Sequence, residues 1–294
     1  MRAFVYRHIG LRRVAGVLAY SAFAVALTAC GTDGISAAGG SPIHLRVVNG
    51  VLYVHGGDTA TTPIDFLIDS AAGEPSILGI PGASVSTCDS VNGYRTIPSG
   101  VHGFLARAAG DTRADNSLYT TPYATAFVPR QAMLSGTYYT MIVAGVVPDS
   151  GDRLGNDVMF SFTIEDPLPG PLIESTGVLQ SRFRVVNAAP NAAPGSGSFG
   201  SVSVYLTPGS AIPADPRVYY ATGRAVYRSA SSYINVNPGS YVVSIISNGT
   251  GAILAQQPLT FARGEVRSLI LLSTAAGVPG TANHKLISVL DHQY

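Results

Sequence analysis

The stretch Ser201-Val202-Ser203-Val204-Tyr205-Leu206 alternates small or polar residues with apolar ones. In an extended strand, successive side chains point to opposite faces, so Val202, Val204 and Leu206 share one face while Ser203 and Tyr205 share the other. A period of two with one apolar face predicts a β-strand that covers a hydrophobic core.

Similar runs, rich in β-branched and large apolar residues, recur through the second half of the chain, at 233–237, 241–246, 267–272 and 286–290. Turn-forming segments separate them at 237–239, 247–251 and 262–265. Helix signals are nearly absent. Short strands at this spacing predict an all-β fold of the sandwich or barrel type.

The chain also contains an internal repeat, which is typical of duplicated domains. Four pairs of segments correspond: 44–49 with 182–187, 63–68 with 201–206, 96–100 with 235–239, and 136–143 with 264–271. Each copy ends in a strand that runs into an acid, at 160–165 and at 286–291. The repeat predicts two β-sandwich domains, 43–166 and 180–294, joined by the proline-rich linker 167–179.

The first 29 residues have the layout of a secretion signal. Four arginines and no acid precede an uncharged apolar core at 14–27. That core is shorter than the roughly 20 residues of a membrane-spanning helix. An uncleaved anchor remains an alternative, because the chain stays uncharged from residue 14 to residue 32.

The segment Leu27-Thr28-Ala29-Cys30 matches the lipobox of bacterial lipoproteins, in which the cysteine thiol accepts a diacylglycerol. By resemblance to that class, residues 1–29 are a lipoprotein signal peptide and Cys30 is the lipid attachment site. Several acyl chains hold a protein stably on a membrane. The 12 small and polar residues from Gly31 to Pro42 form a flexible tether with a reach of roughly 20 Å. By resemblance to enterobacterial lipoproteins, an inner-membrane protein would carry aspartate after the cysteine, whereas Gly31 follows Cys30 here. This favours the outer membrane and leaves open which of its faces carries the protein.

Charge and cysteine content limit the function further. Without the signal peptide the chain has 14 basic and 17 acidic residues, and no basic stripe that would favour nucleic acid. If Cys30 is acylated, Cys88 has no partner within the chain. It is then a small buried residue, an intermolecular disulfide partner or a reactive thiol.

Four segments of the second half carry a family resemblance: Arg-Val-Val-Asn-Ala-Ala-Pro at 184–190, Val-Ser-Val-Tyr-Leu at 202–206, Pro-Gly-Ser-Tyr-Val-Val at 238–243 and the strand 264–271. Their order resembles the bacterial domain of unknown function 4397. The resemblance implies an immunoglobulin-like or transthyretin-like sandwich and a cell-envelope location, with no established activity. The first repeat lacks the Ala-x-Pro. Asn49 and Asn187 stand where the family commonly has histidine, so no role of that histidine carries over.

The sequence motifs that could indicate a cofactor, metal or catalytic site are better explained as loops and turns. The Gly-x-Gly-x-x-Gly at 195–200 follows a proline-rich loop and precedes a strand, whereas a dinucleotide site needs a helix there. The acid-rich segment 149–157 could bind calcium but lacks EF-hand spacing, so a solvated hairpin is the simpler interpretation. The histidines show no zinc-binding spacing, and no Gly-x-Ser-x-Gly elbow occurs. We therefore expect no metal, no cofactor and no enzyme, although acids brought together by folding would escape this reasoning.

Tyrosine is the one enriched aromatic residue, and Tyr219, Tyr220 and Tyr227 are the candidate binding residues. Exposed tyrosines stack on sugars or anchor protein contacts, whereas tyrosines on a sheet often pack across strands. The sequence as a whole predicts a lipid-anchored cell-envelope protein with a non-enzymatic structural or binding role. The alternative is an adhesin or carbohydrate-binding surface lipoprotein that uses exposed tyrosines. The expected partners are the membrane, through the lipid, and a protein or glycan ligand, but no nucleic acid.

Overall fold

The computed structural model describes residues 41–55, 58–61, 63–69, 77–86, 93–109, 128–147, 160–166, 177, 179–189, 200–219, 221–274 and 283–293. These residues are mostly β-strands, and the short 3-10 helix η2 (Pro216–Val218) lies among them. No helix within these ranges has the length and apolar character needed to cross a bilayer.

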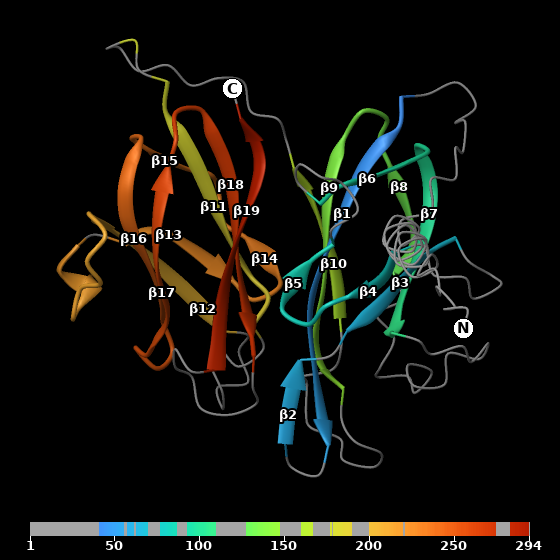
Figure 1. The fold of residues 1–294 in the computed structure, drawn as a ribbon, viewed down its shortest axis with the longest axis horizontal. Helices are drawn as coiled ribbons and strands as arrows, with labels where there is room; N and C mark the ends of the chain where they lie inside the picture. Colours follow the sequence, from blue (N-terminus) through green and yellow to red (C-terminus); the bar gives the residue numbers. More distant parts are fainter. Residues whose placement is uncertain are drawn as a thin grey trace, which may run out of the picture. The chain divides into compact units, whose positions relative to one another are not determined.

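The first half of the described chain forms a sandwich of two sheets (Figure 1). Its larger sheet has the order β10-β9-β1-β2, with β5 and β6 also paired to β1. The strands are β1 (Ile43–His55), β2 (Asp58–Thr61), β5 (Ser84–Val85), β6 (Arg95–Ile97), β9 (Tyr138–Val147) and β10 (Phe160–Asp166). The smaller sheet has the order β4-β3-β7-β8, formed by β3 (Ile64–Ile68), β4 (Ile77–Ile80), β7 (Gly100–Ala108) and β8 (Val128–Met133).

The second half forms a sandwich of the same design. Its larger sheet has the order β14-β11-β18-β19, with β15 also paired to β11. The strands are β11 (Ser181–Asn187), β14 (Ser229–Ala230), β15 (Ile234–Val236), β18 (Glu265–Ser273) and β19 (His284–Gln293). The smaller sheet has the order β13-β12-β16-β17, formed by β12 (Ser201–Pro208), β13 (Ala221–Val226), β16 (Gly239–Ser247) and β17 (Ile253–Phe261).

The internal repeat reappears as a repeat of topology. In each sandwich the opening strand pairs in parallel with a much later strand, β1 with β9 and β11 with β18. Arg46 stands opposite Thr140 in the first pair, and Arg184 stands opposite Ser268 in the second. The predicted fold class, all-β with two sandwiches in tandem, is confirmed.

The alternation in the sequence also identifies the two cores. Val202 and Val204 are fully buried in the core of the second sandwich, as their shared face predicts. Leu45 and Val47 of β1 lie fully buried in the core of the first sandwich. Apolar residues at every second position thus point between the two sheets of their own sandwich.

A third apolar cluster lies between the two larger sheets, so these sheets are buried on both faces. It contains Val48, Ile142 and Ala144 from the first sandwich, and Val186, Ile270 and Leu272 from the second. Residues Ile35–Tyr294 accordingly form a single compact unit. The boundaries 43–166 and 180–294 stay a prediction, and the structure adds that both halves contribute to this shared core.

Candidate functional site

The face of each larger sheet that meets the other sandwich carries charged residues beside its apolar ones. Arg46 follows the same alternation as Val48, and Arg184 the same alternation as Val186, so both arginines point between the sandwiches. Arg46 is fully buried and Arg184 is 4% exposed. Charges at such depth need partners that are themselves buried.

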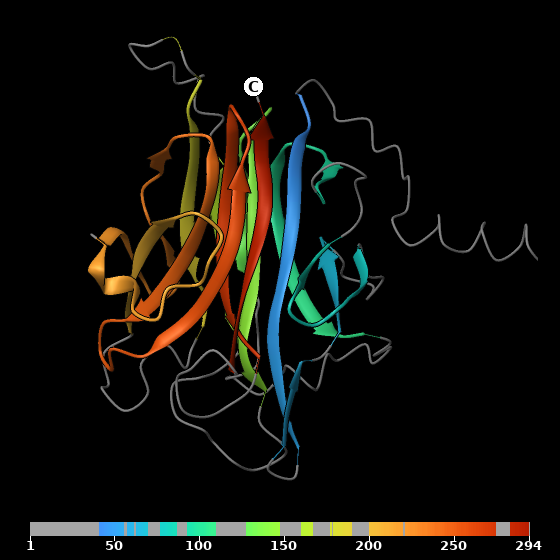
Figure 2. The ribbon, with the colours of Figure 1, turned by 60° about the vertical axis from the view of Figure 1, so that its left-hand side comes forward.

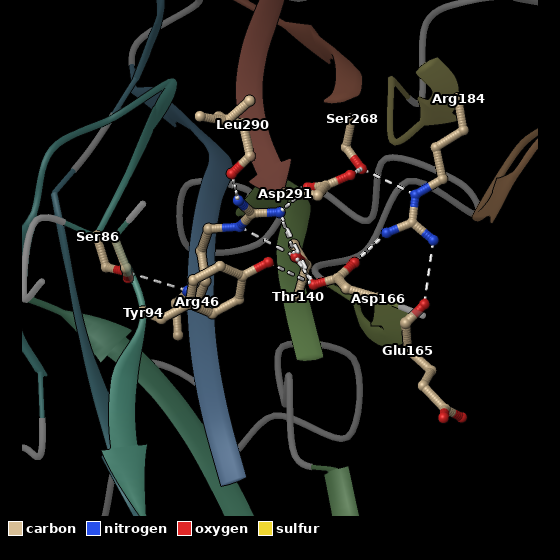
Figure 3. Close-up of polar contacts among 12 residues, drawn as sticks. Arg46, Ser86, Tyr94, Thr140, Glu165, Asp166, Arg184, Ser268, Leu290 and Asp291 are labelled. Carbon is tan, nitrogen blue, oxygen red and sulfur yellow. Dashed lines mark hydrogen bonds and ion pairs between the residues drawn. The ribbon is translucent and has the colours of Figure 1, made fainter. Parts of the chain in front are cut away.

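Arg46 of the first sandwich finds its main partner in the second (Figure 3). Its Nη2 lies 2.6 Å from Oδ1 of Asp291, and its Nη1 donates to the carbonyl of Leu290 at 3.1 Å. Its Nε donates to Oγ1 of Thr140 on the neighbouring strand β9 at 3.0 Å. The guanidinium therefore joins two strands of its own sheet to the last strand of the other sandwich.

Arg184 repeats this arrangement in the opposite direction (Figure 3). Its Nη2 binds Oδ1 of Asp166 in the first sandwich, and its Nη1 donates to the carbonyl of Glu165 at 3.1 Å. Its Nε donates to Oγ of Ser268 on β18 at 2.8 Å. Each sandwich thus supplies an arginine to the other's final aspartate.

The hydroxyl groups complete the set of contacts. Oγ1 of Thr140 donates to Oδ2 of Asp166 at 2.6 Å, and Oγ of Ser268 donates to Oδ2 of Asp291 at 2.7 Å. We call the six residues Arg46, Thr140, Asp166, Arg184, Ser268 and Asp291 the ion-pair network. Nη2 of Arg46 also lies 3.8 Å from Oδ2 of Asp166, so the two halves of the network touch.

Two tyrosines, one from each sandwich, contact the aspartates and arginines of the network. The Tyr94 hydroxyl donates to Oδ2 of Asp166 at 2.9 Å, and the Tyr233 hydroxyl lies 3.4 Å from Oδ2 of Asp291. The Arg46 guanidinium stands 4.5 Å from the centre of the Tyr94 ring, and that of Arg184 stands 5.1 Å from the centre of the Tyr233 ring. Burial raises the pKa of both phenols, so both remain hydrogen-bond donors at neutral pH.

The charge states follow from burial and from opposite charges. Burial raises the pKa of Asp166 above its ordinary value, although Arg46 and Arg184 oppose this shift. Burial alone would lower the pKa of Arg46, but the acidic groups of Tyr94, Asp291 and Asp166 outweigh it and raise that pKa. The network thus sets two arginine side chains against two aspartate side chains inside the protein.

The structure corrects the predicted end of the first repeat. The sequence pairs the strand 160–165 with 286–291, which makes Glu165 the counterpart of Asp291. The contacts instead pair Asp166 with Asp291, because the carbonyls of Glu165 and Leu290 take equivalent places in the two halves. Asp166 directly precedes the proline-rich segment, so the sequence pattern does not reveal that it belongs to the strand.

The arrangement is suited to holding the sandwiches together. Its charged and hydroxyl groups bond to one another, and its four charged side chains are at most 5% exposed. No group of three or more acids, histidines or cysteines that could hold a metal ion occurs in the described ranges. We interpret the network as a structural joint.

A smaller polar pair lies in the first sandwich. Nδ1 of His102 is 2.5 Å from Oδ2 of Asp69, and Nε2 is 2.8 Å from the carbonyl of Pro98. Asp69 also accepts from the Gly103 amide at 2.8 Å. These contacts fix the turn after β3 against β7.

The predicted site residues do not gather at one place. Tyr219 is 39% exposed, next to η2. Tyr227 is 8% exposed and packs in the apolar cluster between the sandwiches, so it cannot form an exposed patch with Tyr219. Tyr220, the lipobox residues Leu27, Thr28, Ala29 and Cys30, the segment 149–157 and Cys88 lie outside the described residues.

Comparisons with known proteins give no close relative. No protein-family model matches the chain, and no curated protein matches it. Among solved structures, a candidate cell adhesion protein from Bacteroides uniformis aligns over 85% of this chain and 98% of its own, at 9% identity and a TM-score of 0.24. The tip fimbrial protein Mfa3 from Porphyromonas gingivalis aligns over 85% and 99%, at 11% identity and a TM-score of 0.21. The fimbrial anchor protein Mfa2 from the same organism aligns over 86% and 100%, at 10% identity and a TM-score of 0.22.

Proposed function

We propose that this chain is a lipid-anchored protein of the bacterial cell envelope whose paired sandwiches form one rigid, non-enzymatic binding module. The observation that carries the proposal is the reciprocal ion-pair network. It uses an arginine and an aspartate from each sandwich to join the two halves. A joint of this kind suits a protein whose binding surface needs the two sandwiches in one fixed arrangement.

The network also defines the two ends of the module. Arg46 lies three residues after Ile43, where β1 begins, and the partner of Arg46, Asp291, lies close to the end of β19. We call this the tether end, because β1 begins there (Figure 1) and the predicted tether precedes β1 in the sequence. The opposite ends of the strands form the distal end, which lies away from the predicted point of attachment.

The anchor is tested by metabolic labelling of cells with a palmitate analogue. The full chain should take up the label and fractionate with membranes, because Cys30 is the acceptor thiol of the lipobox. Cys30→Ser should lose both properties, whereas Cys88→Ser, which removes the chain's other cysteine, should keep them. Retention of the label by Cys30→Ser would refute the anchor.

A more specific role as an adhesin or glycan-binding protein is favoured by exposed side chains on the loop between β12 and β13. Tyr219 on this loop is 39% exposed and its neighbour Val218 is 76% exposed, a combination that can contact a sugar ring. Binding of the detergent-solubilised full chain to a glycan array tests this role. Tyr219→Ala should weaken the signal, and a uniformly blank array would reject glycan binding.

A further inference from the structure

The two sandwiches differ strongly in charge, which the nearly neutral total conceals. Residues 43–166 contain six Lys and Arg against twelve Asp and Glu, whereas residues 180–294 contain eight against three. The second sandwich is therefore the basic half of an otherwise weakly acidic protein. A concentrated positive surface attracts anionic partners and is screened by salt.

Arg224 of the second sandwich differs from Arg184 and Arg267 in the kind of partner that it has. Near the tether end, Arg184 pairs with Asp166, and Arg267 pairs with Glu265 at 2.7 Å. Near the distal end, Arg224 is exposed and its Nη2 donates to Oγ of Ser201 at 2.7 Å. A cation held by a neutral hydroxyl keeps its charge available to a ligand.

Arg217, which belongs to η2, also contacts the distal end of the second sandwich. Asp215 caps η2 and lies 3.2 Å from Nη1 of Arg217, while Nη2 of Arg217 reaches the carbonyl of Gly251. Gly251 belongs to the turn between β16 and β17, and Asn248 of this turn donates to Oγ of Ser201 at 3.0 Å. Arg217 and Arg224 are thus held by one turn and by the strand end beside it.

This region lies at the opposite end of the strands from the network. Asn187, the last residue of β11, donates to the carbonyl of Gly200 at 3.1 Å, which places Ser201 beside the distal end of β11. A strand of seven residues such as β11 spans about 20 Å. The loop with η2 stands on the outer side of the second sandwich in both views (Figures 1 and 2).

Exposed apolar groups accompany these cations. Val226 is 50% exposed and stands opposite Ser201 in the register of β12 with β13, two residues from Arg224. Tyr219 is 39% exposed and lies two residues from Arg217. We call Arg217, Tyr219, Arg224, Val226 and Asn248 the distal basic patch.

We propose that the distal basic patch binds an anionic polysaccharide that carries carboxylate or sulfate groups. The exposed, planar guanidinium of Arg224 matches the two oxygens of such anions, and Arg217 adds a second guanidinium that Asp215 holds in place. The Asn248 amide and the Ser201 hydroxyl suit sugar hydroxyls, and Tyr219 offers a face for a sugar ring. This inference rests on the proposed function, since the predicted anchor joins the tether end and the patch lies at the other end of the strands. The distance of the patch from the anchored end favours a polymer over anionic lipid, and the mixed polar and aromatic surroundings favour a sugar over an acidic protein.

The test uses the detergent-solubilised full chain and immobilised polymers in biolayer interferometry. Heparin and polygalacturonate are the sulfated and carboxylated probes, and dextran is the neutral one. The wild type should bind at least one polyanion, more weakly at high salt, and should ignore dextran. Arg224→Glu should weaken binding about tenfold, as expected for loss of a charged contact and its replacement by repulsion.

Arg263→Glu is the matched control. Arg263 is also exposed and belongs to the second sandwich, but it lies in the turn between β17 and β18, at the tether end. This variant changes the net charge by the same amount and should bind like the wild type. Thermal melts of both variants should match the wild type, because each replaced side chain is exposed.

Several results would overturn the inference. Equal losses in Arg224→Glu and Arg263→Glu would point to net charge alone, and equal binding to dextran would point to a neutral-sugar site. Salt-sensitive self-association without polyanion binding would indicate that the patch binds the acidic first sandwich of a second copy of the chain. Absent binding with intact labelling at Cys30 rejects the patch alone, whereas lost labelling with intact binding rejects the anchor alone.

Discussion

Replacing Asp291 by asparagine removes one negative charge from a buried site that holds two arginines and two aspartates. Arg46, which is fully buried, then loses its carboxylate partner at 2.6 Å, and its remaining acidic neighbour in the network is Asp166, at 3.8 Å. Removing one member of a buried ion pair typically costs about 3–5 kcal/mol, because the other charge is left without compensation. The asparagine still offers one acceptor oxygen, so we expect a loss of about 3 kcal/mol in the free energy of unfolding.

Urea unfolding of the unacylated Cys30→Ser chain, followed by far-ultraviolet circular dichroism, measures this loss. Asp215→Asn is the control, because the Arg217–Asp215 pair has side chains that are 44% and 54% exposed. An exposed pair contributes less than about 1 kcal/mol, so this variant should unfold close to the parent chain.

The double variant Arg46→Met, Asp291→Asn measures the interaction energy between these two residues apart from their interactions with other residues. If the two residues act as a pair, the double variant should be about 2 kcal/mol more stable than the sum of the single losses predicts. Because Asp291 belongs to the second sandwich and Arg46 to the first, the single variant should also broaden a transition that is single in the parent chain. A loss below about 1 kcal/mol for Asp291→Asn, or an equal loss for Asp215→Asn, would refute the structural role of the network.

Two further predictions concern the second sandwich and the shared core. Burial opposes ionisation of Glu265, but hydrogen bonds from Arg267 and the Ala262 amide lower its pKa below the ordinary value. The ionised Glu265 therefore stabilises the folded chain above about pH 4.5, and this stabilisation is lost as the pH falls through the lowered pKa. Glu265→Gln should therefore cost about 1–2 kcal/mol in urea unfolding at pH 7 and much less near pH 3; an equal cost at both pH values would contradict this assignment. Gly50→Ala should lower the thermal midpoint through a cost of about 1–3 kcal/mol, since a Cβ there would lie 2.6 Å from Cδ2 of Leu272 across the sandwich interface. Gly103→Ala, whose Cβ would meet nothing within 4 Å, should change the midpoint little, and similar shifts in both glycine variants would argue against tight packing at the interface.

The sequence by itself determined the strands, their inward faces and the duplication. The alternation in 201–206 depends only on the geometry of an extended chain, so it assigns Val202 and Val204 to a core without reference to the residues that pack against them. The repeated Arg-Val-Val segments likewise predicted that Arg46 and Arg184 take equivalent places in two sandwiches. The lipobox assignment of Cys30 also comes from sequence alone and stays a prediction.

Only the tertiary structure decided what covers the outer faces of the two larger sheets. Periodicity tells which residues share a face, but an arginine on the outer face of a strand is expected to be solvated unless another layer is known to cover it. Arg46 and Asp291 lie 245 residues apart, and no local pattern relates residues at that separation. Packing of one sandwich on the other buries Tyr227 and makes Asp166 the counterpart of Asp291. Alternation alone would leave Arg46 and Arg184 in water, whereas in the structure they join the two sandwiches.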